Sequence, residues 1–132
     1  MKVTADTNIL VRALMQDDAR QAAAAMTVLS EAETIAISLS SLCELVCVLR
    51  RIYNLGKEDI LIALTTLVSA ENVAVDRAAV EAGFAVLQAG GDFADGVIAF
   101  EGRWLGGETF VSFDKKAVSL LTQQGQSAQL LS

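Results

Sequence analysis

The sequence predicts an α/β fold, a three-layer α/β/α sandwich built around a central, mostly parallel sheet of four or five strands. Short apolar segments alternate with single or paired helical segments along the 132 residues. The short segments are almost continuously apolar, which is typical of strands that are covered on both faces of a sheet. Because no repeat, linker or low-complexity tract interrupts this order, we expect residues 1–132 to form one domain.

The first half of the chain should contain three strands and four helices. The predicted strands lie at residues 2–5, 34–38 and 72–75, and the predicted helices at residues 8–15, 17–32, 41–53 and 57–69. The acidic pair at 17–18 favours a helix start before an alanine-rich segment. Ser40 or Ser41 should open the third helix, whose apolar stripe extends to Tyr53, and Gly56 is well placed to end it.

The second half should contain three helices and two strands. The predicted helices lie at residues 77–89, 92–104 and 115–123, and the predicted strands at residues 109–113 and 128–131. Gly90 and Gly91 should end the first of these helices, and Asp92 should start the next one. Gly106 and Gly107 should stop that helix before the strand that follows.

Composition excludes several classes of function. The net charge of −6 argues against a protein that coats nucleic acid through a broad basic surface. The chain has no histidine, so histidine-dependent triads are excluded and any metal site must use oxygen ligands. Cys43 and Cys47 are one helical turn apart, and we expect two core thiols, because two cysteines without histidine cannot complete a structural zinc site.

Apolar content predicts a protein contact, and the N-terminal residues predict the cellular location of the protein. Hydrophobic residues make up 53% of the chain, so we expect some apolar surface to contact a partner or a second copy. Lys2, Asp6 and Arg12 are not compatible with a signal peptide, and no stretch of sequence suits a membrane span. We therefore expect a cytoplasmic protein without membrane contact.

Four carboxylates are expected at one edge of the sheet. Asp6 ends the first strand and Asp114 ends the fourth. Glu44 lies in the first turn of the helix after the second strand, and Asp95 in the first turn of the helix that Asp92 opens. Because the carboxyl ends of parallel strands share one edge, these acidic groups should converge there.

Each carboxylate also has a structural explanation. Ser41 and Glu44 fit a capping box, Asp92 and Asp95 allow the same arrangement, and Asp6 or Asp114 could each cap a helix. However, the helix that carries Glu44 is apolar nearly all round, so we expect Glu44 in a partly buried wall. A buried carboxylate needs a partner, and clustered carboxylates repel one another unless a cation intervenes. Mg²⁺ or Mn²⁺ would suit such a cluster.

Four segments in this order carry a resemblance to a known family. They are residues 5–10 (Ala-Asp-Thr-Asn-Ile-Leu), 41–45 (Ser-Leu-Cys-Glu-Leu), 92–99 (Asp-Phe-Ala-Asp-Gly-Val-Ile-Ala) and 112–114 (Ser-Phe-Asp). Together they resemble the PIN domain, and more narrowly the VapC-type toxins of bacterial toxin–antitoxin pairs. The resemblance covers essentially the whole chain in length, motif order and α/β alternation.

The resemblance implies a ribonuclease that depends on Mg²⁺ or Mn²⁺. It implies an acidic quartet of metal ligands and catalytic groups, namely Asp6, Glu44, Asp95 and Asp114. It also implies supporting roles for Thr7, Asn8 and Ser112, and for Asp92 through a water. The partners implied are an RNA substrate, an antitoxin protein and a second copy of the chain in a homodimer. Gly96 departs from the alanine that is usual in the family, and we expect it to loosen its helix start.

Other functions remain open at this stage. The closest alternative is a housekeeping RNA-processing nuclease of the same family, and a catalytically inactive scaffold of the same fold is a second. A phosphoacceptor receiver domain would need an adjacent acidic pair near the first strand, but the acidic pair at 17–18 lies too far along the chain.

Overall fold

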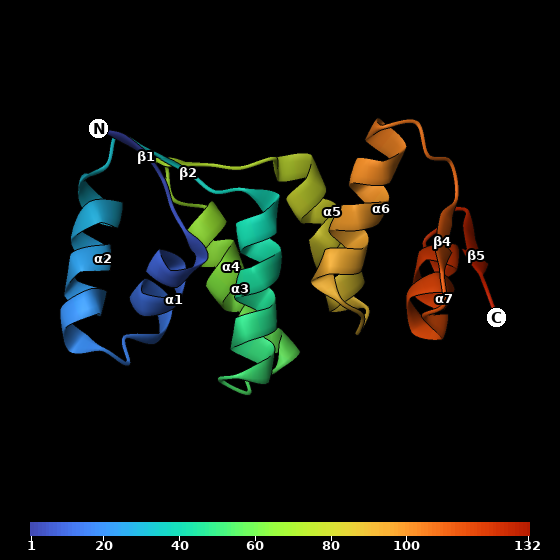
Figure 1. Cartoon of the computed structure of the whole chain (residues 1–132), viewed down its shortest axis with the longest axis horizontal. Helices are drawn as coiled ribbons and strands as arrows, with labels where there is room; N and C mark the ends of the chain where they lie inside the picture. The colour runs from blue at the N-terminus through green and yellow to red at the C-terminus, as the bar shows by residue number, and fades with distance from the viewer. The chain divides into compact units, whose positions relative to one another are not determined.

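The computed structural model describes residues 1–132, which divide into two compact units, Met1–Asp76 and Arg77–Ser132. The first unit contains β1 (Lys2–Thr4), α1 (Thr7–Met15), α2 (Ala19–Glu31), β2 (Thr34–Ala36), α3 (Leu39–Arg51), α4 (Lys57–Val68) and β3 (Val73–Ala74). The second contains α5 (Arg77–Gln88), α6 (Phe93–Trp104), β4 (Phe110–Ser112), α7 (Lys115–Gln123) and β5 (Ala128–Leu130). Every predicted strand and helix forms, within a few residues of its predicted ends (Figure 1).

The first unit contains a parallel sheet in the strand order β1-β2-β3. Val3 is opposite Ile35, and Ile35 is in turn opposite Val73. Since β1 and β2 run in the same direction, their carboxyl ends meet at one edge, and α1 and α3 both begin just beyond that edge. The register therefore brings the first turn of α1 close to the first turns of α3.

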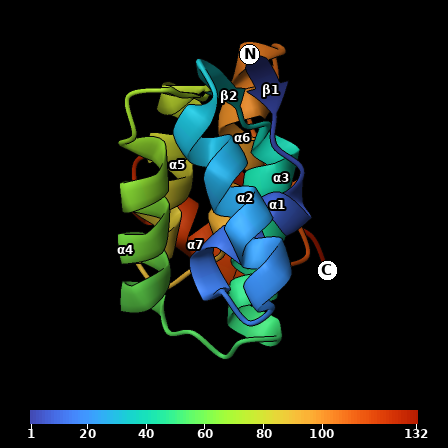
Figure 2. The same ribbon diagram turned by 90° about the vertical axis from the view of Figure 1, so that its left-hand side faces the viewer.

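Helix α1 packs between α2 and α3 in the first unit, as Figures 1 and 2 show. The core beneath these helices is aliphatic and includes Leu10, Ile35, Leu42, Leu45 and Leu49, all at most 2% exposed. Burying each such side chain contributes about 1.5–3 kcal/mol. This packing fixes α1 and α3 as neighbours through buried side chains.

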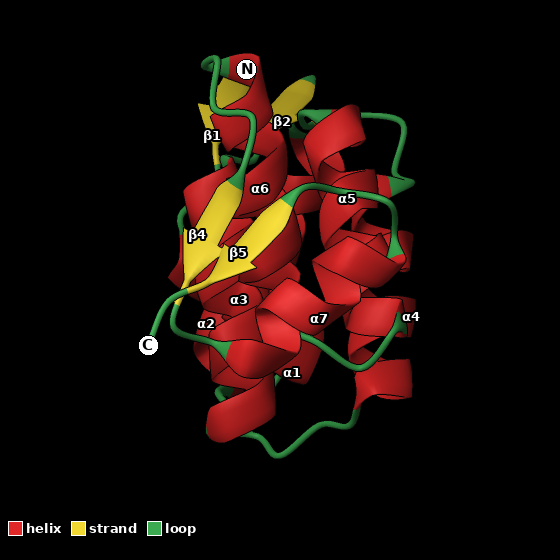
Figure 3. Cartoon of the chain, turned by 90° about the vertical axis from the view of Figure 1, so that its right-hand side faces the viewer, coloured by secondary structure: helices red, strands yellow, loops and turns green.

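The second unit contains a two-stranded parallel sheet, with Phe110 opposite Ala128. Helix α7 packs against β4 and β5, which lie side by side in Figure 3, and α5 packs along α6. All strand pairings in the chain are parallel, as predicted, and hydrogen bonds join the strands into one sheet in each unit. None of the helices is long and apolar enough to cross a membrane.

Candidate functional site

Asp6 lies between β1 and α1 and is the N-cap of that helix. Its Oδ1 accepts a hydrogen bond from the Thr7 N–H at 2.8 Å. The side chain is exposed, and no hydrogen bond reaches its second oxygen. The capping interpretation of Asp6 is therefore correct, and it leaves Oδ2 open for a ligand.

Thr7 connects α1 to Glu44 on α3. The Thr7 side chain is 6% exposed, and its hydroxyl donates a hydrogen bond to Glu44 Oε2 at 3.2 Å. The predicted capping box is wrong, because α3 begins at Leu39 and its N-cap is Ser38, whose hydroxyl accepts from the Ser41 N–H at 3.1 Å. Glu44 thus caps nothing and instead takes its hydrogen bond from another helix.

The predicted partly buried wall around Glu44 is also wrong, since the Glu44 side chain is exposed. The buried stripe of α3 consists of Leu42, Leu45, Val46 and Leu49, and Glu44 lies off that stripe. Cys47 is exposed and Cys43 is only half-buried, so the expectation of two core thiols is wrong as well. The apolar residues of α3 do not all face the core: the helix buries one stripe, and Cys47 lies outside it.

Asn8 lies beside this half of the candidate site, in the first turn of α1, and is exposed. It borders an apolar groove of about 460 Å³ between α1 and α2, which Arg12 and Gln21 also line. Thr7 joins Asp6 to Glu44 at the start of α1, but Glu44 lies in the second turn of α3, so its predicted place in the first turn of that helix is wrong.

Asp95 is the least solvated carboxylate of the predicted quartet. It lies in the first turn of α6, is half-buried, and neither accepts a hydrogen bond nor pairs with a cation. Burial raises the pKa of Asp95 above its ordinary value, and the negative charges of Asp92 and Asp114 raise it further. These three carboxylates of the second unit are therefore close enough to repel one another.

Asp92 and Asp114 are both helix caps. The Asp92 Oδ1 accepts from the Ala94 N–H at 3.2 Å at the start of α6, and the Asp114 Oδ1 accepts from the Ala117 N–H at 3.1 Å at the start of α7. The Asp114 N–H donates to the Ser112 hydroxyl at 2.9 Å, which fixes the turn after β4. Each cap occupies only one carboxylate oxygen.

Gly96 has a different role from the predicted loosening of a helix start. It is buried within α6, and a Cβ at this position would lie 2.3 Å from the Ala82 carbonyl oxygen of α5. A Cβ on Gly83 would in turn lie 2.6 Å from the Phe93 ring. Glycine at these positions lets α5 and α6 approach closely beside the turn that carries Asp95, while the loosening of the helix start stays a prediction.

The donor set fits a hard divalent cation. Asp6 and Glu44 belong to the first unit, and Asp95 and Asp114 belong to the second. Within each unit, no three Cys, Asp or Glu side chains lie close enough to hold a metal ion, so convergence of the quartet stays a prediction. The fit rests on chemistry: the donors are all oxygens, the caps leave oxygens open, and the mutual repulsion around Asp95 has no protein cation to offset it.

Comparison with known proteins identifies the family. The PIN domain family matches residues 3–120, a range that spans both compact units and contains every residue of the predicted quartet. A search of curated proteins gave no match. The match confirms the predicted α/β fold class with its parallel strands, and PIN domains are generally nucleases that bind RNA and use divalent metal ions. On the strength of this match, the chain belongs to the PIN domain family.

Proposed function

We propose that this protein is an endoribonuclease that depends on Mg²⁺ or Mn²⁺ and is the toxin of a type II toxin–antitoxin pair. The observation that carries the proposal is Asp95, a half-buried carboxylate that is repelled by Asp92 and Asp114 and forms no salt bridge. Such an arrangement raises the free energy of the folded state unless a positive charge is bound. Binding of a divalent cation would remove this repulsion, and a metal-dependent nuclease needs such a cation at its active site.

The proposed ligands are Asp6, Glu44, Asp95 and Asp114, with Asp92 assisting through a water. The family match extends over both units, which supports one nuclease domain over residues 1–132. When bound, the divalent cation supplies a lowered pKa to a bound water and positive charge near the scissile phosphate. The protein positions the carboxylates through hydrogen bonds from neighbouring polar groups.

The polar neighbours orient the acidic groups. The Thr7 hydroxyl holds Glu44 Oε2, and the Thr7 N–H holds one oxygen of Asp6. Ser112 fixes the backbone of Asp114. Asn8 is exposed beside Asp6 and can donate its amide hydrogens to an RNA phosphate or sugar. These groups restrict the rotamers of the ligands, which is what a preorganised site requires.

The proposed partners are RNA, an antitoxin protein and a second copy of this chain. Several large apolar side chains are strongly exposed, among them Ile62 at 65%, Trp104 at 80% and Leu105 at 89%. Exposed apolar surface of this kind supports an additional protein contact. We propose that the protein acts in the cytoplasm, where both RNA and an antitoxin are present.

The deciding experiment measures cleavage of single-stranded RNA by the purified chain with Mg²⁺, with Mn²⁺ and with a chelator. We expect cleavage with either ion, none with the chelator, and none in Asp95→Asn. The matched control is Asp59→Asn, because Asp59 is exposed in the first turn of α4 and should leave cleavage unchanged.

Two results would redirect the proposal. RNA that stays intact with both ions would favour the inactive scaffold. Cleavage in vitro without growth arrest on expression in a bacterium would favour a housekeeping RNA-processing nuclease instead of a toxin. Growth arrest that co-expression of an antitoxin relieves is the expected result.

A further inference from the structure

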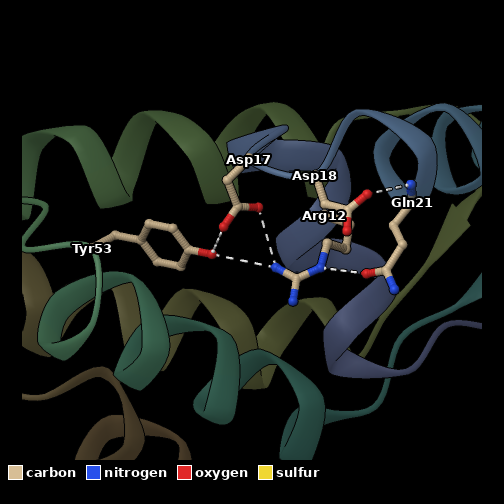
Figure 4. Close-up of polar contacts among 5 residues, drawn as sticks. All are labelled: Arg12, Asp17, Asp18, Gln21 and Tyr53. Carbon is tan, nitrogen blue, oxygen red and sulfur yellow. Dashed lines mark hydrogen bonds and ion pairs between the residues drawn. The ribbon is translucent and has the colours of Figure 1, made fainter.

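We propose that Arg12, Asp17 and Tyr53 form a positioning network that fixes the end of α1 against α3 and thereby holds Thr7 and Glu44 in place. The inference rests on the proposed nuclease function and adds residues outside the acidic quartet to it. Figure 4 shows the three side chains converging, together with Gln21.

The network has well-defined geometry. The Tyr53 hydroxyl donates to Asp17 Oδ2 at 2.6 Å, and Arg12 Nη1 donates to Asp17 Oδ1 at 3.2 Å and to the Tyr53 oxygen at 3.4 Å. Arg12 Nε donates to Gln21 Oε1 at 2.7 Å (Figure 4). One guanidinium thus binds residues of the α1–α2 turn, of α2 and of the segment after α3, and a lysine could not make all these contacts at once.

Helix α1 is consequently fixed to α3 at both of its ends. Thr7 binds Glu44 at the start of α1, and Arg12 binds Tyr53 in its last turn, about 7.5 Å farther along the axis. Thr7 contacts Glu44 in the second turn of α3, and Arg12 contacts Tyr53 just after its end, so the contacts advance along both helices in the same direction. Movement of α1 along α3 would have to break both connections, and without the Tyr53 connection only the Thr7–Glu44 hydrogen bond and the buried side chains set the position of α1 on α3.

The backbone around the network supports the same conclusion. Gln16 has a φ of 52°, in the left-handed region, and this sharp turn carries the chain back so that Asp17 reaches Arg12. Asn54 has a φ of 56° directly after Tyr53. At Gln16 this is the left-handed end of α1, where the Gln16 N–H donates to the Arg12 carbonyl oxygen, and asparagine is among the residues that most readily adopt such a φ. These two turns place Asp17 and Tyr53 on either side of Arg12.

Electrostatics agree with the geometry. The Tyr53 hydrogen bond lowers the pKa of Asp17, and the same bond raises the pKa of Tyr53. The hydrogen bond to Tyr53 is also the main cause that raises the pKa of Arg12. Because the groups are substantially exposed, an ion pair such as Arg12–Asp17 adds little to global stability. We therefore expect this ion pair to affect the position of α1 more than the free energy of unfolding.

The test substitutes Tyr53→Phe in the full chain, which removes the hydroxyl and keeps the ring. We expect kcat for RNA to fall about tenfold with KM unchanged, because a small misplacement of a catalytic group is costly to the rate. The melting temperature should change by less than about 2 °C. Asp17→Ala should have the same effect, and the double variant should be no worse than either single one, since both remove one network.

A structural readout makes the test independent of cleavage. The backbone amide signals of Thr7 and Asn8 should shift in the NMR spectrum of metal-free Tyr53→Phe. Ser69→Ala is the matched control, because it removes an exposed hydroxyl hydrogen bond of 2.6 Å at the end of α4 in the same unit. It should leave both the amide signals and kcat unchanged.

The outcomes separate the two proposals. An unshifted Thr7 signal, or a normal kcat in Tyr53→Phe, overturns the positioning network while the nuclease survives. A wild-type chain that cleaves no RNA overturns the proposed function, and the NMR comparison still decides whether the network positions Thr7.

Discussion

The α-carbon of Gly96 lies so close to α5 that a methyl group there would be 2.3 Å from the carbonyl oxygen of Ala82. This distance is shorter than any real contact of a Cβ, so the two helices can approach only because position 96 has no side chain. Asp95 is the preceding residue. The packing of α6 on α5 therefore determines where the half-buried carboxylate lies.

We expect Gly96→Ala to destabilise the protein by about 1–3 kcal/mol, because α6 must move away from the Ala82 backbone. It should also lower cleavage, since Asp95 moves with the helix. Urea unfolding and RNA cleavage measure the two effects. The matched control is Gly102→Ala on the same helix, where a Cβ meets nothing within 4 Å. Helix propensity predicts that this control gains about 0.5–1 kcal/mol, and equal effects at both sites would contradict the close-approach role.

We expect Asp6→Asn and Asp6→Ala to differ in stability and to agree in activity. Asparagine can still accept the Thr7 N–H and cap α1, whereas alanine loses the cap at a cost of about 1 kcal/mol. Both variants remove the proposed metal ligand, so both should fail to cleave RNA. The measurements are the melting temperature of the metal-free protein and RNA cleavage in Mn²⁺. Normal cleavage by Asp6→Asn would show that Asp6 is a helix cap and not a metal ligand.

We expect Asp95→Asn to stabilise the metal-free protein at neutral pH. Burial, and then Asp92 and Asp114, raise the pKa of Asp95 in the folded state above its ordinary value of 3.8. The folded protein therefore binds this proton more tightly than the unfolded chain does, and stability falls as pH rises through the raised pKa. Asp95→Asn has no charge at this position, so its free energy of unfolding does not fall in this way. After screening by solvent at this half-buried site, the gain should not exceed about 1 kcal/mol.

Urea unfolding of metal-free wild type and Asp95→Asn between about pH 3 and pH 8 measures this effect. The difference in unfolding free energy should be present at neutral pH and vanish below pH 3.8, where the wild-type carboxyl is protonated in both states. A difference that does not change with pH would show that the carboxylate is not repelled by its neighbours. Asp59→Asn, on the exposed first turn of α4, controls for loss of a helix-start charge.

Local patterns predicted much of the fold and the candidate residues. Apolar runs, glycine stops and cap residues identified all strands and helices, because helix and strand formation depends largely on residues near one another in the chain. The same signals placed Asp6, Asp92 and Asp114 directly before helices, and all three are caps. The helix start at α3 was misplaced because Ser38, Ser40 and Ser41 all suit a cap.

Contacts between distant residues could not be predicted in this way. Tyr53 continued an apolar stripe in the sequence, yet its hydroxyl binds Asp17, which is 36 residues away. The role of Gly96 depends on the Ala82 backbone of a different helix. No local signal reports which helix will lie opposite a given side chain.

Residue type and short-range spacing were enough to predict the α/β order and to exclude histidine from any metal site, and the metal site that the four carboxylates would form stays a prediction. The packed structure was needed to show which acids are caps, which carboxylate lacks a partner, and that Thr7 donates a hydrogen bond to Glu44, 37 residues away. The physical reason is that desolvation and hydrogen bonding between helices depend on how buried faces pack. That packing is a property of the whole unit.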